Sequence, residues 1–154
     1  MQALKQLRTL IHEIPPRLNK LAPSQLELKP SANSWSPKEE LGHLLDSAAN
    51  NHQRIVRVQL EDKLKMPGYD GNAWVELHRY QQRNWQEMIE LWRALNKQLL
   101  AAAEAVRDSA WSRTCTIAGS KPLTLKFVFE DYLDHMTHHL EHIGINTDDL
   151  KPEA

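Results

Sequence analysis

Apolar side chains recur at spacings of three and four residues along most of the chain, which is the pattern of amphipathic α-helices. The first such stripe comprises Leu4, Leu7, Leu10, Ile11, Ile14, Leu18 and Leu21. Pro15 and Pro16 fall inside it, and we expect them to kink or split this helix because each ring removes a hydrogen-bond donor. The polar stretch that follows, residues 22–35, predicts a loop.

A second helix is predicted where the apolar pattern resumes. Residues 36–39 read Ser-Pro-Lys-Glu, in which the serine can cap, the proline suits the first helical position and the glutamate completes a capping box. From there the pattern extends to about Lys65. Residues 66–72 contain a proline and two glycines, so we expect the next connection there, of the crossover kind.

The rest of the chain predicts two more long helices. One should run from Trp74 to about Arg107, and the last, capped by Thr124, from Leu125 to about Asn146. Four long amphipathic helices predict an all-α protein folded as a four-helix bundle, an architecture whose core commonly holds metal sites. The length fits a single domain spanning residues 1–154.

Charge and composition narrow the possible partners and locations. The 19 basic and 20 acidic side chains nearly cancel, and neither sign forms the long run that is typical of a nucleic-acid-binding arm. The longest apolar stretch, 99–106, is interrupted by Glu104 and is far shorter than the roughly 20 residues that span a bilayer. No segment has the pattern of a secretory signal. We therefore expect a cytoplasmic protein that binds neither nucleic acid nor membrane.

Histidine is the residue type that stands out. The chain has 8 histidines but a single cysteine, Cys115, so neither an intramolecular disulfide nor a cysteine-based zinc site is possible. Two pairs at i and i+4 lie in the last predicted helix, His135 with His139 and His138 with His142. This spacing places both rings of a pair on one helical face, where they can share a metal ion.

Helical periodicity distinguishes the two pairs. The apolar stripe of this helix is made by Leu125, Val128, Phe129, Tyr132, Met136, Leu140 and Ile143. From the centre of that stripe His139 lies roughly 60° and His135 roughly 100° away, because each residue turns the helix by about 100°. The corresponding angles are roughly 120° for His142 and roughly 160° for His138. The first pair therefore borders the core, although a solvated face without metal is an alternative interpretation.

The remaining histidines supply the candidates for a third ligand, which a metal site normally needs. They are His12, His43, His52 and His78. His52 and His78 lie on apolar stripes and are expected to be core histidines, with lining of the site as the alternative. His43 lies on a polar strip that, by the pattern alone, would face solvent. Spacing therefore does not select the third ligand.

Two segments of the chain, 35–44 and 135–143, together resemble the DinB-like superfamily. The first reads Trp-Ser-Pro-Lys-Glu-Glu-Leu-Gly-His-Leu and the second His-Met-Thr-His-His-Leu-Glu-His-Ile. Superfamily members begin their second helix with a Trp-Ser segment leading to a histidine, and carry a histidine pair at i and i+4 in the fourth. The resemblance implies a four-helix bundle of up-down-down-up topology with one divalent metal ion, zinc or nickel in several members. The ligands it implies here are His43, His135 and His139.

The end of the second segment departs from the superfamily pattern. Many members have Gly-Gln or Gly-Asn before an isoleucine, whereas this chain has Glu-His before Ile143. The departure keeps His138 and His142 as an alternative pair, while the matching isoleucine favours His135 and His139.

Three further side chains are candidates for supporting roles. Asp131, one turn before His135, could accept the second ring proton of that histidine, or could be an ordinary exposed carboxylate near the start of a helix. Asn50 and Arg54 lie on the strip of His43 and could orient an anionic substrate, or could be ordinary surface residues. No catalytic role is assigned to any of them.

The resemblance also implies a function for the expected metal site. Three neutral imidazoles leave positions open on a divalent ion, which lowers the pKa of a bound water or thiol. Characterised branches of the superfamily include thiol S-transferases that use low-molecular-weight bacterial thiols, and others resemble metal-dependent hydrolases. We expect one of these activities on a small-molecule substrate, in a homodimer.

Two alternatives to this function follow from the same residues. The alternative to an enzyme is a non-enzymatic bundle that binds a small molecule or is associated with stress, in which the metal is structural or absent. A di-iron site, suggested by Glu40-x-x-His43, is disfavoured because the last helix contains no second Glu-x-x-His.

Overall fold

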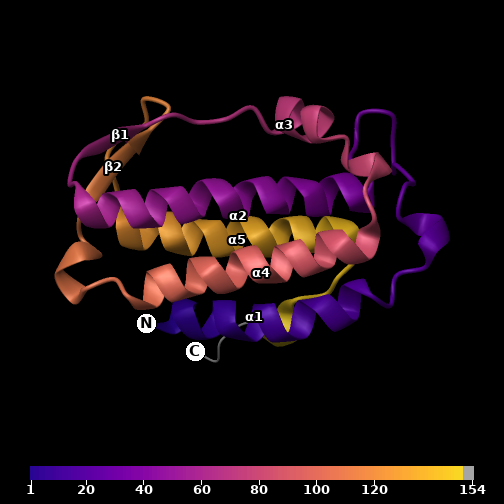
Figure 1. Ribbon diagram of the computed structural model, residues 1–154, viewed down its shortest axis with the longest axis horizontal. Helices are drawn as coiled ribbons and strands as arrows, with labels where there is room; N and C mark the ends of the chain where they lie inside the picture. Colours follow the sequence, from indigo (N-terminus) through magenta and orange to yellow (C-terminus); the bar gives the residue numbers. More distant parts are fainter. Residues whose placement is uncertain (151–154) are drawn as a thin grey trace.

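Four long helices form the body of the protein in the computed structural model, which describes residues 1–150. They are α1 (Gln2–Leu18), α2 (Pro37–Leu60), α4 (Trp85–Glu104) and α5 (Leu125–Ile143). Figure 1 shows α1 and α5 running in one direction and α2 and α4 in the other. The expected all-α four-helix bundle with up-down-down-up order is confirmed.

Capping side chains fix where α2 and α5 begin. The Ser36 hydroxyl accepts a hydrogen bond from the backbone N–H of Glu39, and the Glu39 carboxylate accepts one from the N–H of Ser36. This is the capping box that the sequence predicts. The Thr124 hydroxyl accepts a hydrogen bond from the N–H of Phe127 and so caps the start of α5, and Gly144, with φ of 94°, caps its end.

The connection between α2 and α4 is a crossover, because these two helices are parallel. It contains a short strand, β1 (Leu64–Met66), a two-turn helix, α3 (Gly71–His78), and a single 3₁₀ turn, Tyr80–Gln82. In Figure 1 this segment returns along the outer side of α2 from its C-terminal to its N-terminal end. The crossover predicted around residues 66–72 is therefore present.

Two predicted helix boundaries were wrong. The second helix ends at Leu60 rather than about Lys65, and β1 follows it. The single helix predicted from Trp74 to about Arg107 is divided into α3 and α4. The division falls at Arg79, which adopts a left-handed conformation with φ of 51°.

Two further features of the structure differ from the prediction, namely a small sheet and an unbroken first helix. β1 pairs in parallel with β2 (Thr114–Ile117), and β2 pairs with β3 (Leu123–Thr124) in antiparallel orientation. The sheet was not predicted, and it covers one end of the bundle. Pro15 and Pro16 do not split α1, which continues to Leu18, and the Pro15 carbonyl accepts a hydrogen bond from the N–H of Asn19.

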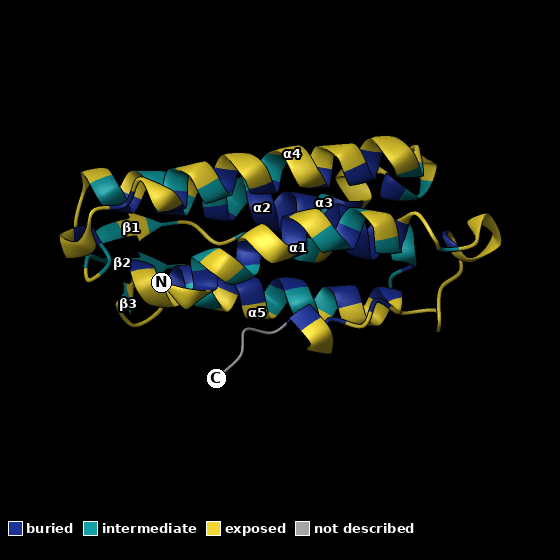
Figure 2. Ribbon diagram, turned by 90° about the horizontal axis from the view of Figure 1, so that it is seen from below, coloured by how far each residue is buried: buried dark blue, intermediate teal, exposed yellow. Residues whose placement is uncertain are grey.

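The core lies between the four long helices. Figure 2 shows exposed residues along the outer sides of α1 and α4, whereas α2 is largely buried. The largest fully buried side chains include Trp92, Tyr132 and Phe129. The Tyr132 hydroxyl donates to the amide oxygen of Asn96 at 2.5 Å, so these two buried groups are paired, whereas Nε1 of Trp92 has no hydrogen-bond partner within the described residues. No helix of the described chain is both long and apolar enough to cross a membrane.

Candidate metal centre

The fold brings His43 of α2 together with His135 and His139 of α5. The Nε2 atoms of His43 and His135 are 3.0 Å apart. The ring centre of His139 lies 4.5 Å from that of His43 and 4.4 Å from that of His135. One ring nitrogen from each of the three residues lies within 4.8 Å of the other two.

His43 is buried, although the polar strip on which it lies predicted an exposed residue. Its exposed fraction is 7%, and the ring of Trp35 lies over it with ring centres 4.7 Å apart. Gly71, the first residue of α3, covers another side of the ring. A Cβ atom at that position would lie 3.1 Å from Cε1 and 3.3 Å from Nδ1 of His43. The crossover and the loop before α2 therefore bury this strip, which helical periodicity cannot reveal.

Burial keeps two of the three rings neutral. The pKa of His43 is lowered to about 3, mainly by burial and then by the neighbouring His139 and His135. The pKa of His135 is lowered to about 4 by burial, by His139 and His138, and by Arg54. A neutral imidazole offers the lone pair that a metal ion requires, so these rings are ready to bind a cation at neutral pH.

Glu40 is the outer partner of the site, a role that the sequence analysis missed. Its carboxylate accepts a hydrogen bond from Nδ1 of His139 at 2.6 Å, and its other oxygen lies 3.3 Å from Nδ1 of His142. The side chain is only 8% exposed. A carboxylate on Nδ1 holds the proton there and leaves Nε2 of His139 free to bind a metal. The position of Glu40 one turn before His43 was the available signal, but it was considered only for a di-iron site.

Asp131, the predicted outer partner of His135, makes no hydrogen bond to that ring within the described chain and is exposed. The Ser47 hydroxyl lies 3.4 Å from Nδ1 of His135 instead. Ser47 is on α2, one turn after His43, so the same helix supports both rings.

The other histidines lie outside the cluster of three. His78 is exposed, contrary to the prediction of a core histidine, and its Nδ1 lies 3.1 Å from the buried carboxylate of Asp46. His52 is half-buried. His138 and His142 are exposed, with ring centres 4.3 Å apart, so the alternative pair faces outward as periodicity predicted.

A surface pocket of about 310 Å³ lies beside the cluster. It is lined by Asn33, Ser34, Trp35, Glu40, Asn72, His139 and His142. Glu40, His139 and His142 also have ligand atoms within 4.8 Å of one another, on the solvent side of the cluster of three. The pocket gives a small molecule a route to His139.

The geometry fits a divalent cation. Zn–N bonds of about 2.0–2.1 Å in a tetrahedral site place neighbouring nitrogens about 3.3 Å apart, close to the 3.0 Å between His43 and His135. Buried imidazoles supply neutral donors, and a carboxylate orients one of them. Fold and site together define a four-helix bundle with a histidine-rich centre suited to a divalent metal ion.

Comparison with known proteins agrees with this class. The chain belongs to the DinB superfamily, whose model matches residues 6–143. It is 24% identical over 139 residues to YfiT of Bacillus subtilis (strain 168), described as a candidate metal-dependent hydrolase. That match covers 87% of this chain and 78% of YfiT.

Solved structures show the same fold at low sequence identity. YfiT, a four-helix bundle of unusual topology, superposes with a TM-score of 0.69 at 22% identity, covering 94% of this chain and 89% of YfiT. The mycothiol-dependent maleylpyruvate isomerase gives a TM-score of 0.70 at 12% identity, covering 92% of this chain but 58% of the isomerase. A DinB-like protein of Bacillus subtilis gives a TM-score of 0.66 at 12% identity, covering 99% and 94%.

Proposed function

We propose that the protein is a metal-dependent enzyme that acts on a small molecule and binds one divalent cation, zinc or nickel, through His43, His135 and His139. The observation that carries the proposal is the convergence of three ring nitrogens, two of them 3.0 Å apart, from two helices. Imidazole is a good ligand for both metals. A cation with three protein ligands acts as a Lewis acid and lowers the pKa of a water or thiol that joins it.

The surrounding residues have roles that follow from their contacts. Glu40 holds the proton of His139 on Nδ1, and Ser47 limits rotation of the His135 ring. Trp35 covers His43 and excludes water from one side of the centre. The pocket beside His139, which Trp35 also lines, would admit the substrate.

The reaction we propose is thiol transfer or hydrolysis. Hydrolysis is supported by the similarity to YfiT, and the use of a low-molecular-weight thiol by the shared fold of the mycothiol-dependent isomerase. Both reactions need an activated nucleophile, which is what the centre would supply. The single domain, the homodimer and the cytoplasmic location remain predictions from the sequence.

Turnover by metal-loaded protein tests this function. Protein loaded with Zn²⁺ or Ni²⁺ is assayed with a thiol plus an electrophile, and separately with an activated ester. We expect turnover that metal removal and His139→Ala both abolish, and that His52→Ala leaves unchanged because His52 lies outside the centre. Stoichiometric metal binding without turnover in either assay would contradict the enzymatic proposal and favour a non-enzymatic binding protein.

A further inference from the structure

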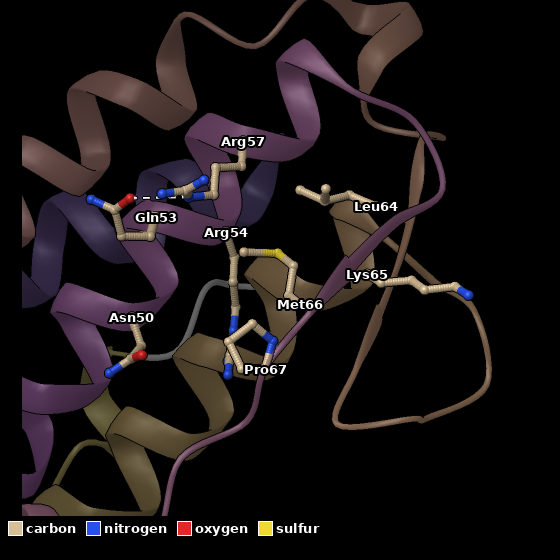
Figure 3. Close-up of a pocket in the computed structure, with 8 residues that line it drawn as sticks. All are labelled: Asn50, Gln53, Arg54, Arg57, Leu64, Lys65, Met66 and Pro67. Atoms are coloured by element: carbon tan, nitrogen blue, oxygen red, sulfur yellow. Dashed lines mark hydrogen bonds between the residues drawn. The ribbon is translucent and has the colours of Figure 1, made fainter.

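A second pocket lies farther along α2, towards its C-terminal end. It has a volume of about 360 Å³ and is formed between α2 and the crossover. Its lining, drawn in Figure 3, consists of Asn50, Gln53, Arg54, Arg57, Leu64, Lys65, Met66 and Pro67. Three of these residues are cationic and none is acidic, in a chain whose net charge is only −1. The lining of this pocket therefore carries an excess of positive charge, which favours an anion there.

Arg54 is the half-buried cation among the three that line the pocket, whereas Arg57 and Lys65 are exposed. It is half-buried, and its guanidinium donates to the amide oxygen of Asn51 at 3.3 Å, with no ion pair to any residue of the described chain. Asp131 of α5 exerts only a longer-range attraction on it. Charged groups taken out of water are normally paired, so a half-buried guanidinium with several unused donors is suited to an external anion.

The other two cations support Arg54 rather than replace it. In Figure 3 the Arg57 side chain folds back along α2, where its Nε donates to Gln53 at 3.2 Å, while Lys65 points away from the pocket. Arg54 instead extends toward Pro67 at the crossover. The bidentate guanidinium of Arg54 is thus the group best placed to bind a carboxylate or a phosphate.

Tyr69 lies two residues after Pro67 of the pocket lining and near the histidine centre. Its ring centre lies 6.4 Å from that of His43, and Ser47 and Arg54 are among the groups that act electrostatically on its hydroxyl. The positive charge of Arg54 also lowers the pKa of His135. Ser47 and Arg54 are seven residues apart on α2, which corresponds to about 10 Å along the helix.

We infer that the Arg54 pocket binds the anionic end, a carboxylate or phosphate, of an extended small molecule whose reacting group lies at the histidine centre. The position of the reacting group rests on the proposed function, whereas anion binding by the Arg54 pocket does not. It assigns the substrate class as a small organic anion about 10 Å long, with its nucleophile or scissile group at the end away from the charge.

Anion binding to metal-free protein tests the pocket without the metal. Inorganic phosphate and succinate are titrated separately and followed by NMR through the backbone amides of residues 64–66. We expect Arg54→Gln to weaken binding about tenfold, the loss of a charge-assisted hydrogen bond, and Arg54→Lys to weaken it less. The exposed Arg93→Gln on α4 removes the same charge and should have no effect. Unperturbed amides, or equal weakening in R54Q and R93Q, would overturn the inference. The probe that binds more tightly, phosphate or succinate, identifies the kind of anion.

Thiol binding to Co²⁺-loaded protein tests the link to the histidine centre. Glutathione carries carboxylates and a thiol, whereas 2-mercaptoethanol carries a thiol alone, and thiolate bound to Co²⁺ has its own absorption band. We expect R54Q to raise the glutathione concentration needed for half-saturation about tenfold and to leave that of 2-mercaptoethanol unchanged. Equal effects on both thiols would overturn the assignment of an extended anionic substrate. A missing band with either thiol would count against the proposed function, whereas the succinate and phosphate titrations would still decide the pocket.

Discussion

The carboxylate of Glu40 accepts a hydrogen bond of 2.6 Å from Nδ1 of His139, across the interface between α2 and α5. The same α2 turn carries His43, three residues later, so one helix supplies both a ring to the cluster and the group that orients a ring of the facing helix. This pairing is the arrangement expected of a prepared metal centre, and it supports the proposed assignment.

Replacing Glu40 by glutamine should weaken metal binding. The amide keeps the shape of the side chain but loses the charge that fixes the Nδ1–H form of His139, and such outer partners typically contribute 10–100-fold in affinity. Competition with a chromophoric chelator measures the affinity directly. Asp134→Asn is the matched control, because Asp134 is an exposed carboxylate next to His135 with no bond to the cluster. Equal affinity in E40Q and D134N would show that the carboxylate does not orient His139.

The stability of the metal-free protein should depend on pH through His43 and His135. Their pKa values, about 3 and about 4 when folded, lie below the ordinary value of 6.5 expected in the unfolded chain. The unfolded chain therefore binds more protons at mildly acidic pH, and the free energy of unfolding falls as pH drops from about 6.5 towards about 4.

Urea denaturation of metal-free protein at about pH 7 and about pH 5 checks this expectation. The midpoint should be lower at the acidic pH in the natural chain. The drop should be smaller in the double variant His43→Gln, His135→Gln, which cannot take up these protons. An identical drop in both proteins would assign the pH dependence to other groups.

Gly42→Ala should destabilise the bundle. A Cβ atom there would lie 2.1 Å from Cδ2 of Tyr80, whose ring is buried and whose hydroxyl donates to Asp46 at 2.6 Å. Burial holds the Tyr80 ring, and the hydrogen bond to Asp46 holds its hydroxyl, so the ring has little room to move aside. We therefore expect a loss of about 1–3 kcal/mol in the free energy of unfolding. The double variant with Tyr80→Ala should be less destabilised than the sum of the two single variants, since the clash is removed. Strict additivity of the two changes would show that the ring moves aside freely.

The sequence predicts the long helices well because their signals are local. The capping box at Ser36 and the cap at Thr124 lie where the structure has them, and the apolar stripe of the last helix faces the core. The division at Arg79 was missed, although Asn84 followed by Glu87 has the spacing of a second helix start, and Asn84 does cap α4. An apolar stripe that continues across the break concealed it.

The site was predictable only in part. Periodicity selects His135 and His139, since both border the core on one helix. His43 is buried by Trp35 and Gly71, which come from other segments, so the pattern within its own helix gave the wrong exposure and only the family resemblance indicated it. The spacing of Glu40 and His43 shows that they share a face of α2, but the role of Glu40 depends on His139 of the facing helix, which that spacing does not identify.

Metal content of a histidine-to-alanine series tests the central claim most directly. The natural protein is loaded with Zn²⁺, desalted and analysed by mass spectrometry of the metal, alongside variants with folding checked by circular dichroism. We predict one equivalent in the natural chain and in the controls His52→Ala and His138→Ala, and a near-complete loss in His43→Ala, His135→Ala and His139→Ala. Full metal content in His43→Ala, or loss in His138→Ala with retention in His135→Ala, would contradict the assignment of this centre.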